Sequence, residues 1–102
     1  MEVGVKVLVV ITYDVNTETP EGRTRLRKVA KQCVNYGQRV QNSVFECIMD
    51  YSKALEVQNI LTKIIDSEKD SLRLYYIGKN YRNKVVHIGT KKVLDLEAPL
   101  II

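Results

Sequence analysis

A single aspartate, Asp14, closes a strongly apolar run, and its type and position are the first in the chain to suggest chemistry. The run from Val3 to Tyr13 reads VGVKVLVVITY, with Lys6 as its only charge. Runs this rich in β-branched residues predict a buried central strand. A polar segment over residues 16–19 follows at once, and functional side chains concentrate at such strand-to-loop junctions. Asp14 is therefore either a functional carboxylate or a residue that only caps a turn, and its position leaves both open.

Basic residues are segregated along the chain, which has a net charge of +4. Residues 20–40 carry six lysines and arginines against one acid, and residues 79–92 carry five with no acid. Residues 43–70 are acidic on balance. Segregation of this kind suggests a polyanionic partner on one surface, although charge runs most often mean only a solvated face.

Length and composition predict one globular domain over residues 1–102, with 45% hydrophobic and 27% charged residues. We expect a cytoplasmic protein, because the sequence has neither an apolar stretch long enough to cross a bilayer nor a signal peptide. The two cysteines, Cys33 and Cys47, fit neither a metal-ligand spacing nor a disulfide framework, so we expect both to be buried free thiols.

Hydrophobic periodicity and turn residues predict the elements that must position these side chains. The first helix follows a Thr19-Pro20 start signal and stops before Gly37. The second is capped by Asp50 or Ser52. The expected elements are a strand over 4–13, a helix over 20–36, strands over 39–41 and 44–49 around an Asn-Ser turn, a helix over 53–66, strands over 71–77 and 85–88, and a C-terminal tail over 90–102.

The element order is βαββαβ plus an extra strand, which is the ferredoxin-like α+β arrangement, with two helices on one face of an antiparallel sheet. The strand over 4–13 has apolar residues on both faces, so the second sheet face also needs cover. A homodimer that packs sheet on sheet would supply that cover. The strand over 85–88 and the tail would then be free to extend the partner's sheet edge or to contact other partners.

Three strings taken in order resemble those of the small CRISPR-associated adaptation nucleases, the Cas2 proteins. They are residues 11–15 (ITYDV) after the apolar run, residues 36–37 (YG) at the end of the arginine-rich helix, and residues 39–46 (RVQNSVFE). The resemblance covers nearly the whole chain. It implies a ferredoxin-like homodimer and favours a nucleic-acid partner for the basic surface.

The same resemblance implies a metal-dependent endonuclease that cuts RNA or double-stranded DNA during spacer acquisition in antiviral defence. Asp14 would bind Mg²⁺, or another divalent cation such as Mn²⁺, together with its copy from the other protomer. Hard cations prefer oxygen ligands, and two apposed carboxylates repel each other unless a cation or a proton lies between them. The metal would polarise a phosphate and activate water.

Other site residues follow from the resemblance. Tyr13 matches the residue before the family's aspartate, and Ser43 and Phe45 match the family's Ser-x-Phe pair, which makes all three candidate catalytic residues. Tyr13 also fits a core or dimer-interface role, Phe45 a core role and Ser43 a turn. The nucleic-acid-binding residues would neutralise phosphates without reading sequence. They are Arg23, Arg25, Arg27, Lys31 and Arg39. Of the three helix arginines, two match the family pattern, with Arg25 and Arg27 as the preferred pair.

A second function class stays open, in which the dimer is a non-catalytic scaffold. It would hold duplex DNA between copies of the adaptation integrase, with the basic helix and the 79–92 loop on phosphates and residues 94–102 docked on the integrase. A small-molecule-binding regulator is a weaker alternative, because it gives no reason for the basic helix.

Overall fold

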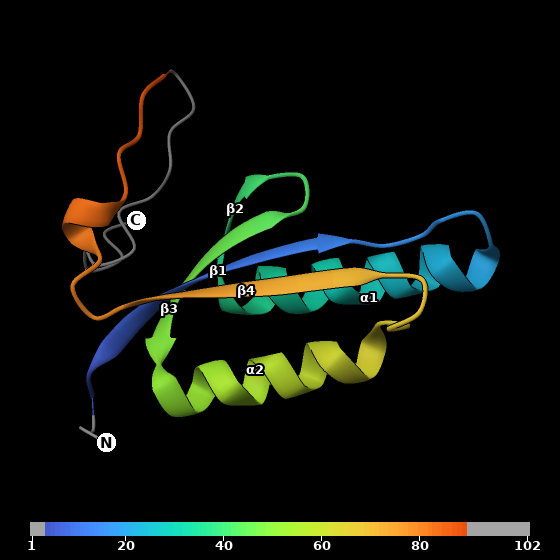
Figure 1. Ribbon diagram of the computed structural model, residues 1–102, viewed down its shortest axis with the longest axis horizontal. Helices are drawn as coiled ribbons and strands as arrows, with labels where there is room; N and C mark the ends of the chain where they lie inside the picture. Colours follow the sequence, from blue (N-terminus) through green and yellow to red (C-terminus); the bar gives the residue numbers. More distant parts are fainter. Residues whose placement is uncertain (1–3, 90–102) are drawn as a thin grey trace.

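The computed structural model describes residues 4–89 and confirms the predicted βαββαβ order (Figure 1). A single antiparallel sheet has the strand order β2-β3-β1-β4, and both helices cover one of its faces. The elements are β1 (Lys6–Asp14), α1 (Pro20–Tyr36), β2 (Gln38–Gln41), β3 (Val44–Asp50), α2 (Tyr51–Ile64) and β4 (Ser71–Gly78).

The core lies between the sheet and the two helices, as the apolar stripes predict. β1 and β3 both alternate, so that their odd-numbered residues face the helices. Phe45, Ile11 and Leu61 are the largest side chains with no exposed surface. Cys33 and Cys47 are buried free thiols, as predicted, and burial raises the pKa of both to about 12.

Helix α1 starts as its sequence predicts and ends for a different reason. The Thr19 hydroxyl oxygen accepts a hydrogen bond from the Gly22 N–H at 3.1 Å, and Pro20 occupies the first turn. At the other end Gly37 is extended, with φ −154°, so it is not the left-handed cap that a stop glycine usually provides. A Cβ there would overlap the Cys47 sulfur and lie 2.7 Å from the Glu46 carbonyl oxygen. Gly37 therefore permits close packing of the helix end against β3.

Helix α2 runs two residues earlier than predicted at both ends, over 51–64 in place of 53–66. Of the two candidate caps, Asp50 is the one used, because its Oδ1 accepts from the Lys53 N–H at 2.8 Å. Asp50 also pairs with Lys6 across the β1–β3 ladder. The strand therefore passes directly into the helix, at the opposite end of β1 from Asp14.

The sheet face away from the helices, which we call the open face, is covered by neither helix and carries apolar and polar side chains together. It carries the alternate residues of three neighbouring strands, and β-pairing sets them in rows. Tyr75 on this face keeps 43% of its surface exposed. The row nearest Asp14 sets Val44 beside Thr12 and Thr12 beside Arg73. Leu8, farther from Asp14 on the same face, is only 2% exposed. The expectation of an uncovered second face is therefore confirmed for the part of the face nearer Asp14.

The fifth strand predicted over 85–88 is wrong for the single chain. A 3₁₀ turn, η1 (Arg82–Lys84), follows β4, and the next residues form no ladder in the part of the chain that the structure describes. Val85 is extended, but a strand needs a hydrogen-bonding neighbour. Val86 and Ile88 are 79% and 89% exposed. The tail predicted over 90–102 lies outside the described residues. Within 4–89, neither helix is long and apolar enough to span a membrane.

Candidate functional site

Asp14 is the last residue of β1, and its side chain is exposed on the open face of the sheet. The alternation of β1 places Asp14 on the same face as Thr12, and the β1–β4 pairing sets it opposite Ser71. A carboxylate in this position is accessible to solvent and to anything that docks on the open face. The alternative role of Asp14 as a turn cap has no support among the hydrogen bonds of the described residues. The side chains bonded to the following loop are those of Asn16, Thr19, Arg23 and Asp70.

One chain alone supplies too few ligands for a metal site. Within residues 4–89, no group of three or more His, Cys, Asp or Glu side chains is arranged to hold a metal ion. Asp14 supplies one carboxylate, and carboxylate oxygens are suitable ligands for a hard cation such as Mg²⁺. Most of the coordination positions of the cation would have to be filled by other ligands. The donor chemistry therefore fits the predicted metal only if a second copy contributes.

Tyr13 points to the opposite face of the sheet from Asp14 and belongs to the core. It is 6% exposed, and its ring stacks on Phe45 with centroids 6.2 Å apart. Its hydroxyl donates to the Asn42 carbonyl oxygen at 3.4 Å, at the turn between β2 and β3. Burial raises the pKa of Tyr13, so the phenol stays protonated at neutral pH. This placement favours the structural role for Tyr13 over a catalytic one.

Phe45 is completely buried, which favours its core role over a catalytic contact. The guanidinium of Arg39 lies 5.1 Å from the centre of its ring, an approach that is typical of a cation–π contact. Ser43 lies in the turn before β3, and its carbonyl oxygen accepts from the Tyr13 N–H at 3.2 Å. Tyr13, Arg39, Ser43 and Phe45 therefore form one cluster on the helix side, which the sheet separates from Asp14.

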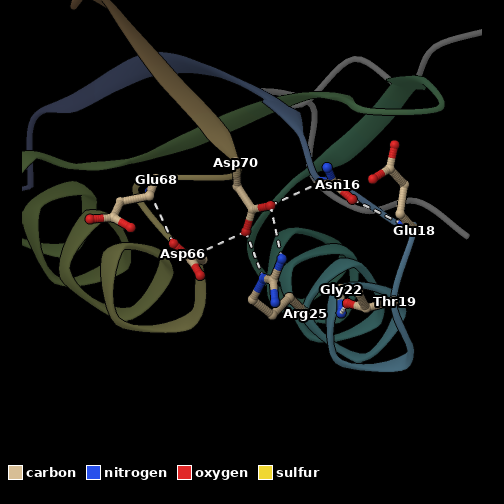
Figure 2. Close-up of polar contacts among 8 residues, drawn as sticks. All are labelled: Asn16, Glu18, Thr19, Gly22, Arg25, Asp66, Glu68 and Asp70. Atoms are coloured by element: carbon tan, nitrogen blue, oxygen red, sulfur yellow. Dashed lines mark hydrogen bonds and ion pairs between the residues drawn. The ribbon is translucent and has the colours of Figure 1, made fainter.

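Arg25 does not lie free for a phosphate, in contrast to its predicted role. Its Nε donates to Asp70 Oδ2 at 2.7 Å and its terminal NH2 nitrogen donates to Asp70 Oδ1 at 3.2 Å. Figure 2 shows this forked pair between α1 and the segment that leads into β4. A bidentate pair with a fully buried carboxylate uses the donors that would otherwise grip a phosphate. Arg27 is therefore the better supported member of the preferred arginine pair.

The Asp70 carboxylate collects four hydrogen bonds from three parts of the chain. Besides the two from Arg25, Oδ1 accepts from the Asn16 N–H at 3.0 Å and Oδ2 accepts from the Asp66 N–H at 2.8 Å (Figure 2). We call this set, Asp70 with Arg25, Asn16 and Asp66, the Asp70 clamp. The Asp70 side chain has no exposed surface, and each of its two oxygens accepts two of the four hydrogen bonds.

The clamp makes the fold sensitive to acid. The Arg25 guanidinium is the main reason that the pKa of Asp70 falls from 3.8 to about 2; burial opposes this shift, and the Asp66 and Asn16 N–H groups reinforce it. A carboxyl with a lower pKa in the folded state adds stability that is complete above its unfolded pKa and is lost as pH falls through the folded one. We expect stability to decline from about pH 4 to about pH 2, and Asp70→Asn to remove this part of the decline. Urea unfolding at several pH values in this window measures it.

The exposed basic residues of α1 lie where the sequence predicts. Arg23, Arg27 and Lys31 recur every fourth residue and are all exposed. Arg23 also donates to the Thr17 carbonyl oxygen at 3.0 Å, which ties it to the loop before the helix. These charges therefore form a line along the outer surface of α1, on the helix layer of the molecule.

Sequence reasoning missed Asp70 and its loop partners. Asp70 lies 45 residues from Arg25 along the chain and 54 from Asn16, so no local spacing connects them. Gly22 was also missed: a Cβ on it would overlap the Asn16 carbonyl oxygen. The sequence carries one signal for this contact, which is the glycine itself. Helix propensity disfavours glycine in a helix, so its presence in the first turn indicates a close approach of another part of the chain.

The fold and the site together define a class: a small ferredoxin-like domain that presents one carboxylate on an open sheet face and a line of basic residues on its helix layer. Residues 7–85 match the model of the family described as CRISPR associated protein Cas2. The chain belongs to this family.

Curated relatives and a solved structure agree with that assignment. The chain is 62% identical to the CRISPR-associated endonuclease Cas2 of Halalkalibacterium halodurans, over 92% of this chain and 98% of the relative. It is 53% identical to the CRISPR-associated endoribonuclease Cas2 of Nitratidesulfovibrio vulgaris, over 93% of each chain. The crystal structure of Streptococcus pyogenes Cas2 at pH 6.5 matches with a TM-score of 0.68 and 56% identity, over 80% of this chain and 99% of that one.

Proposed function

We propose that the protein is a metal-dependent endonuclease of CRISPR adaptation that hydrolyses phosphodiester bonds of RNA or double-stranded DNA as a homodimer. The observation that carries this proposal is the exposed Asp14 carboxylate at the edge of the open sheet face. The names of its close relatives, endonuclease and endoribonuclease, support the same reaction class.

The proposed site lies between two copies of Asp14. Mg²⁺ or Mn²⁺, when bound there, supplies charge that polarises the scissile phosphate and lowers the pKa of a bound water. The two carboxylates would hold the cation, and their mutual repulsion would disfavour a dimer with an empty site. Asp14 is exposed in the single chain, so no rearrangement of the fold is needed to bring it to a partner.

The homodimer follows from surfaces that one chain leaves uncovered. The open face carries Tyr75 at 43% exposure, and the extended segment after η1 carries Val86 and Ile88 with most of their surface exposed. A second copy packed on the open face would bury Tyr75. Pairing of residues 85–88 with the partner's sheet edge would bury Val86 and Ile88. Light scattering at micromolar concentration tests this, and a monomer would contradict the proposal.

A cleavage assay tests the nuclease reaction itself. Purified protein is incubated with labelled RNA and with duplex DNA, in Mg²⁺, in Mn²⁺ and after chelation. We expect cleavage that requires the divalent ion. Absence of cleavage of both substrates with every metal and across the accessible pH range would leave the scaffold function.

The scaffold function is a second proposal, and the separation of the two charged surfaces favours it. Arg27 and Lys31 lie on the helix layer, whereas Asp14 lies on the open face of the sheet. A duplex that follows α1 would therefore be held away from the carboxylate of the same chain. In this role the dimer would bridge copies of the adaptation integrase, with the C-terminal tail as the docking segment. Intact spacer acquisition by a cleavage-dead variant would favour it.

The basic line on α1 makes a prediction about salt. We expect Arg27→Ala and Lys31→Ala each to weaken duplex binding and to lower the slope of log K against log salt by about 0.9 for each phosphate that is no longer neutralised. Fluorescence anisotropy over a range of salt concentrations measures the slope. The matched control is Lys63→Ala, an exposed lysine on α2. An equal change in slope for all three variants would contradict a specific role for α1.

A further inference from the structure

We propose that Asp70 is a positioning residue for Asp14, because it fixes the end of β1 and the loop that leaves it. This inference rests on the proposed metal site and deepens it. Asp70 has no exposed side-chain surface, so it touches neither substrate nor metal and acts only through the chain segments that it binds. Three features of the structure carry the argument: the pairing at the end of β1, the bonds of the clamp, and the packing of Gly22.

Asp14 itself is paired on one side only. The β1–β3 ladder ends at the pair Thr12–Val44, and the last backbone bond on that side runs from the Tyr13 N–H to the Ser43 carbonyl oxygen, one residue before Asp14. The β1–β4 ladder continues to the pair Asp14–Ser71. Ser71 directly follows Asp70, so the position of the Asp14 backbone depends on how the chain enters β4.

The clamp continues this pairing beyond the last ladder position. Asp70 Oδ1 accepts from the N–H of Asn16, two residues after Asp14, so the 70–71 segment contacts the chain on both sides of Val15. The bonds from Arg25 and Asp66 fasten the same carboxylate to α1 and to the segment after α2 (Figure 2). The end of β1 is thereby tied to α1 and to the segment after α2 through one buried side chain.

Gly22 restricts the position of the Asn16 carbonyl group, whereas Asp70 restricts the position of the Asn16 N–H. The Asn16 carbonyl oxygen lies so close to Gly22 that a Cβ would overlap it, while the Asn16 N–H is bonded to Asp70. The peptide groups on either side of Asn16 therefore have little room to move. Two copies of Asp14 that bind one small cation must be held in accurate positions. An error of about 1 Å in the position of a reacting group costs about 100-fold in rate.

The test is Asp70→Asn, which is nearly isosteric but leaves one acceptor oxygen for four donors. We expect the half-saturating Mg²⁺ concentration for cleavage to rise about tenfold, as for other groups that orient metal ligands. Hydrogen exchange at the Asn16 amide should quicken at least tenfold, and Mn²⁺ binding followed by electron paramagnetic resonance should weaken in parallel. All rates are compared per folded molecule, well below the Tm of each variant.

Two further variants separate positioning from general stability. Gly22→Ala keeps the Asp70–Arg25 pair but displaces the loop, so it should raise the Mg²⁺ requirement as Asp70→Asn does. Asp50→Ala removes the cap of α2 at the far end of β1, so it should lower Tm and leave Asn16 exchange and Mg²⁺ dependence unchanged.

Two outcomes overturn the inference in distinguishable ways. Wild-type protein that binds Mn²⁺ while Asp70→Asn and Gly22→Ala bind it equally well refutes the positioning role alone. Wild-type protein that neither cleaves nor binds Mn²⁺ refutes the proposed metal site, and the positioning role with it.

Discussion

Replacing Asp14 by alanine is expected to lower Mg²⁺-dependent cleavage about 100-fold or more. Loss of groups that merely orient metal ligands already costs about 10- to 100-fold, and this substitution removes a ligand from both protomers at once. The side chain is exposed, so the fold should tolerate the change within about 0.5 kcal/mol. Initial rates on labelled RNA and duplex DNA at several Mg²⁺ concentrations measure the effect.

The matched control for Asp14→Ala is Glu56→Ala, which removes an exposed carboxylate from α2. Glu56 pairs with Lys53 on the helix surface and lies away from the open face. It should leave the rate unchanged. If Asp14→Ala kept the wild-type rate while folding and dimerising normally, the proposed metal site would be wrong. If instead cleavage vanished but spacer acquisition persisted, catalysis would be dispensable to the scaffold function.

Phe45→Ala is expected to have the largest effect on stability, a loss of about 3–5 kcal/mol in the free energy of unfolding. Phe45 has no exposed surface and contacts Tyr13 within the main core cluster, so truncation leaves a cavity that the neighbouring elements can fill only in part. A domain of this size has about 5–15 kcal/mol of stability in total, so the variant approaches unfolding. Urea denaturation with an unchanged slope measures the loss.

Phe45→Leu decides between the core role and the predicted catalytic role. Leucine keeps an apolar side chain in the cavity, so the loss of stability should be smaller than for alanine. If Phe45 acts only by packing, the cleavage rate per folded molecule should equal that of the wild type. A large loss of rate in a stable Phe45→Leu protein would contradict a role confined to the core.

The order of the elements follows from the sequence because most signals are local. The apolar stripe of α1 and the alternation in β3 depend on spacings of two to four residues, and both are confirmed. The start of α2 is the exception, since two capping residues were available and only the structure distinguishes Asp50 from Ser52. The extra strand over 85–88 is wrong for one chain because a strand depends on a partner that the local pattern does not specify.

The candidate site divides in the same way. The alternation of a strand places neighbouring residues on opposite faces, so the separation of Tyr13 from Asp14 was predictable from the sequence. The prediction that both are catalytic came instead from the resemblance to the family. Arg25 shows the limit: it lies in the basic first helix, yet its partner lies 45 residues away along the chain. Buried pairs between distant segments leave no periodic signal, so the Asp70 clamp is visible only in the folded chain.

The position of Asp14 on the open sheet face has a consequence for regulation by concentration. A cation held between two copies is a ligand of the dimer and not of the separated chains, so metal binding and association share one free energy. By linkage, Mg²⁺ at the proposed site would tighten the pairing of the chains by the same factor by which pairing would tighten Mg²⁺ binding. At protein concentrations below the dissociation constant, the number of complete sites falls with the square of the concentration of chains. A cell that makes little of this protein would therefore hold it almost entirely in a form without a complete site.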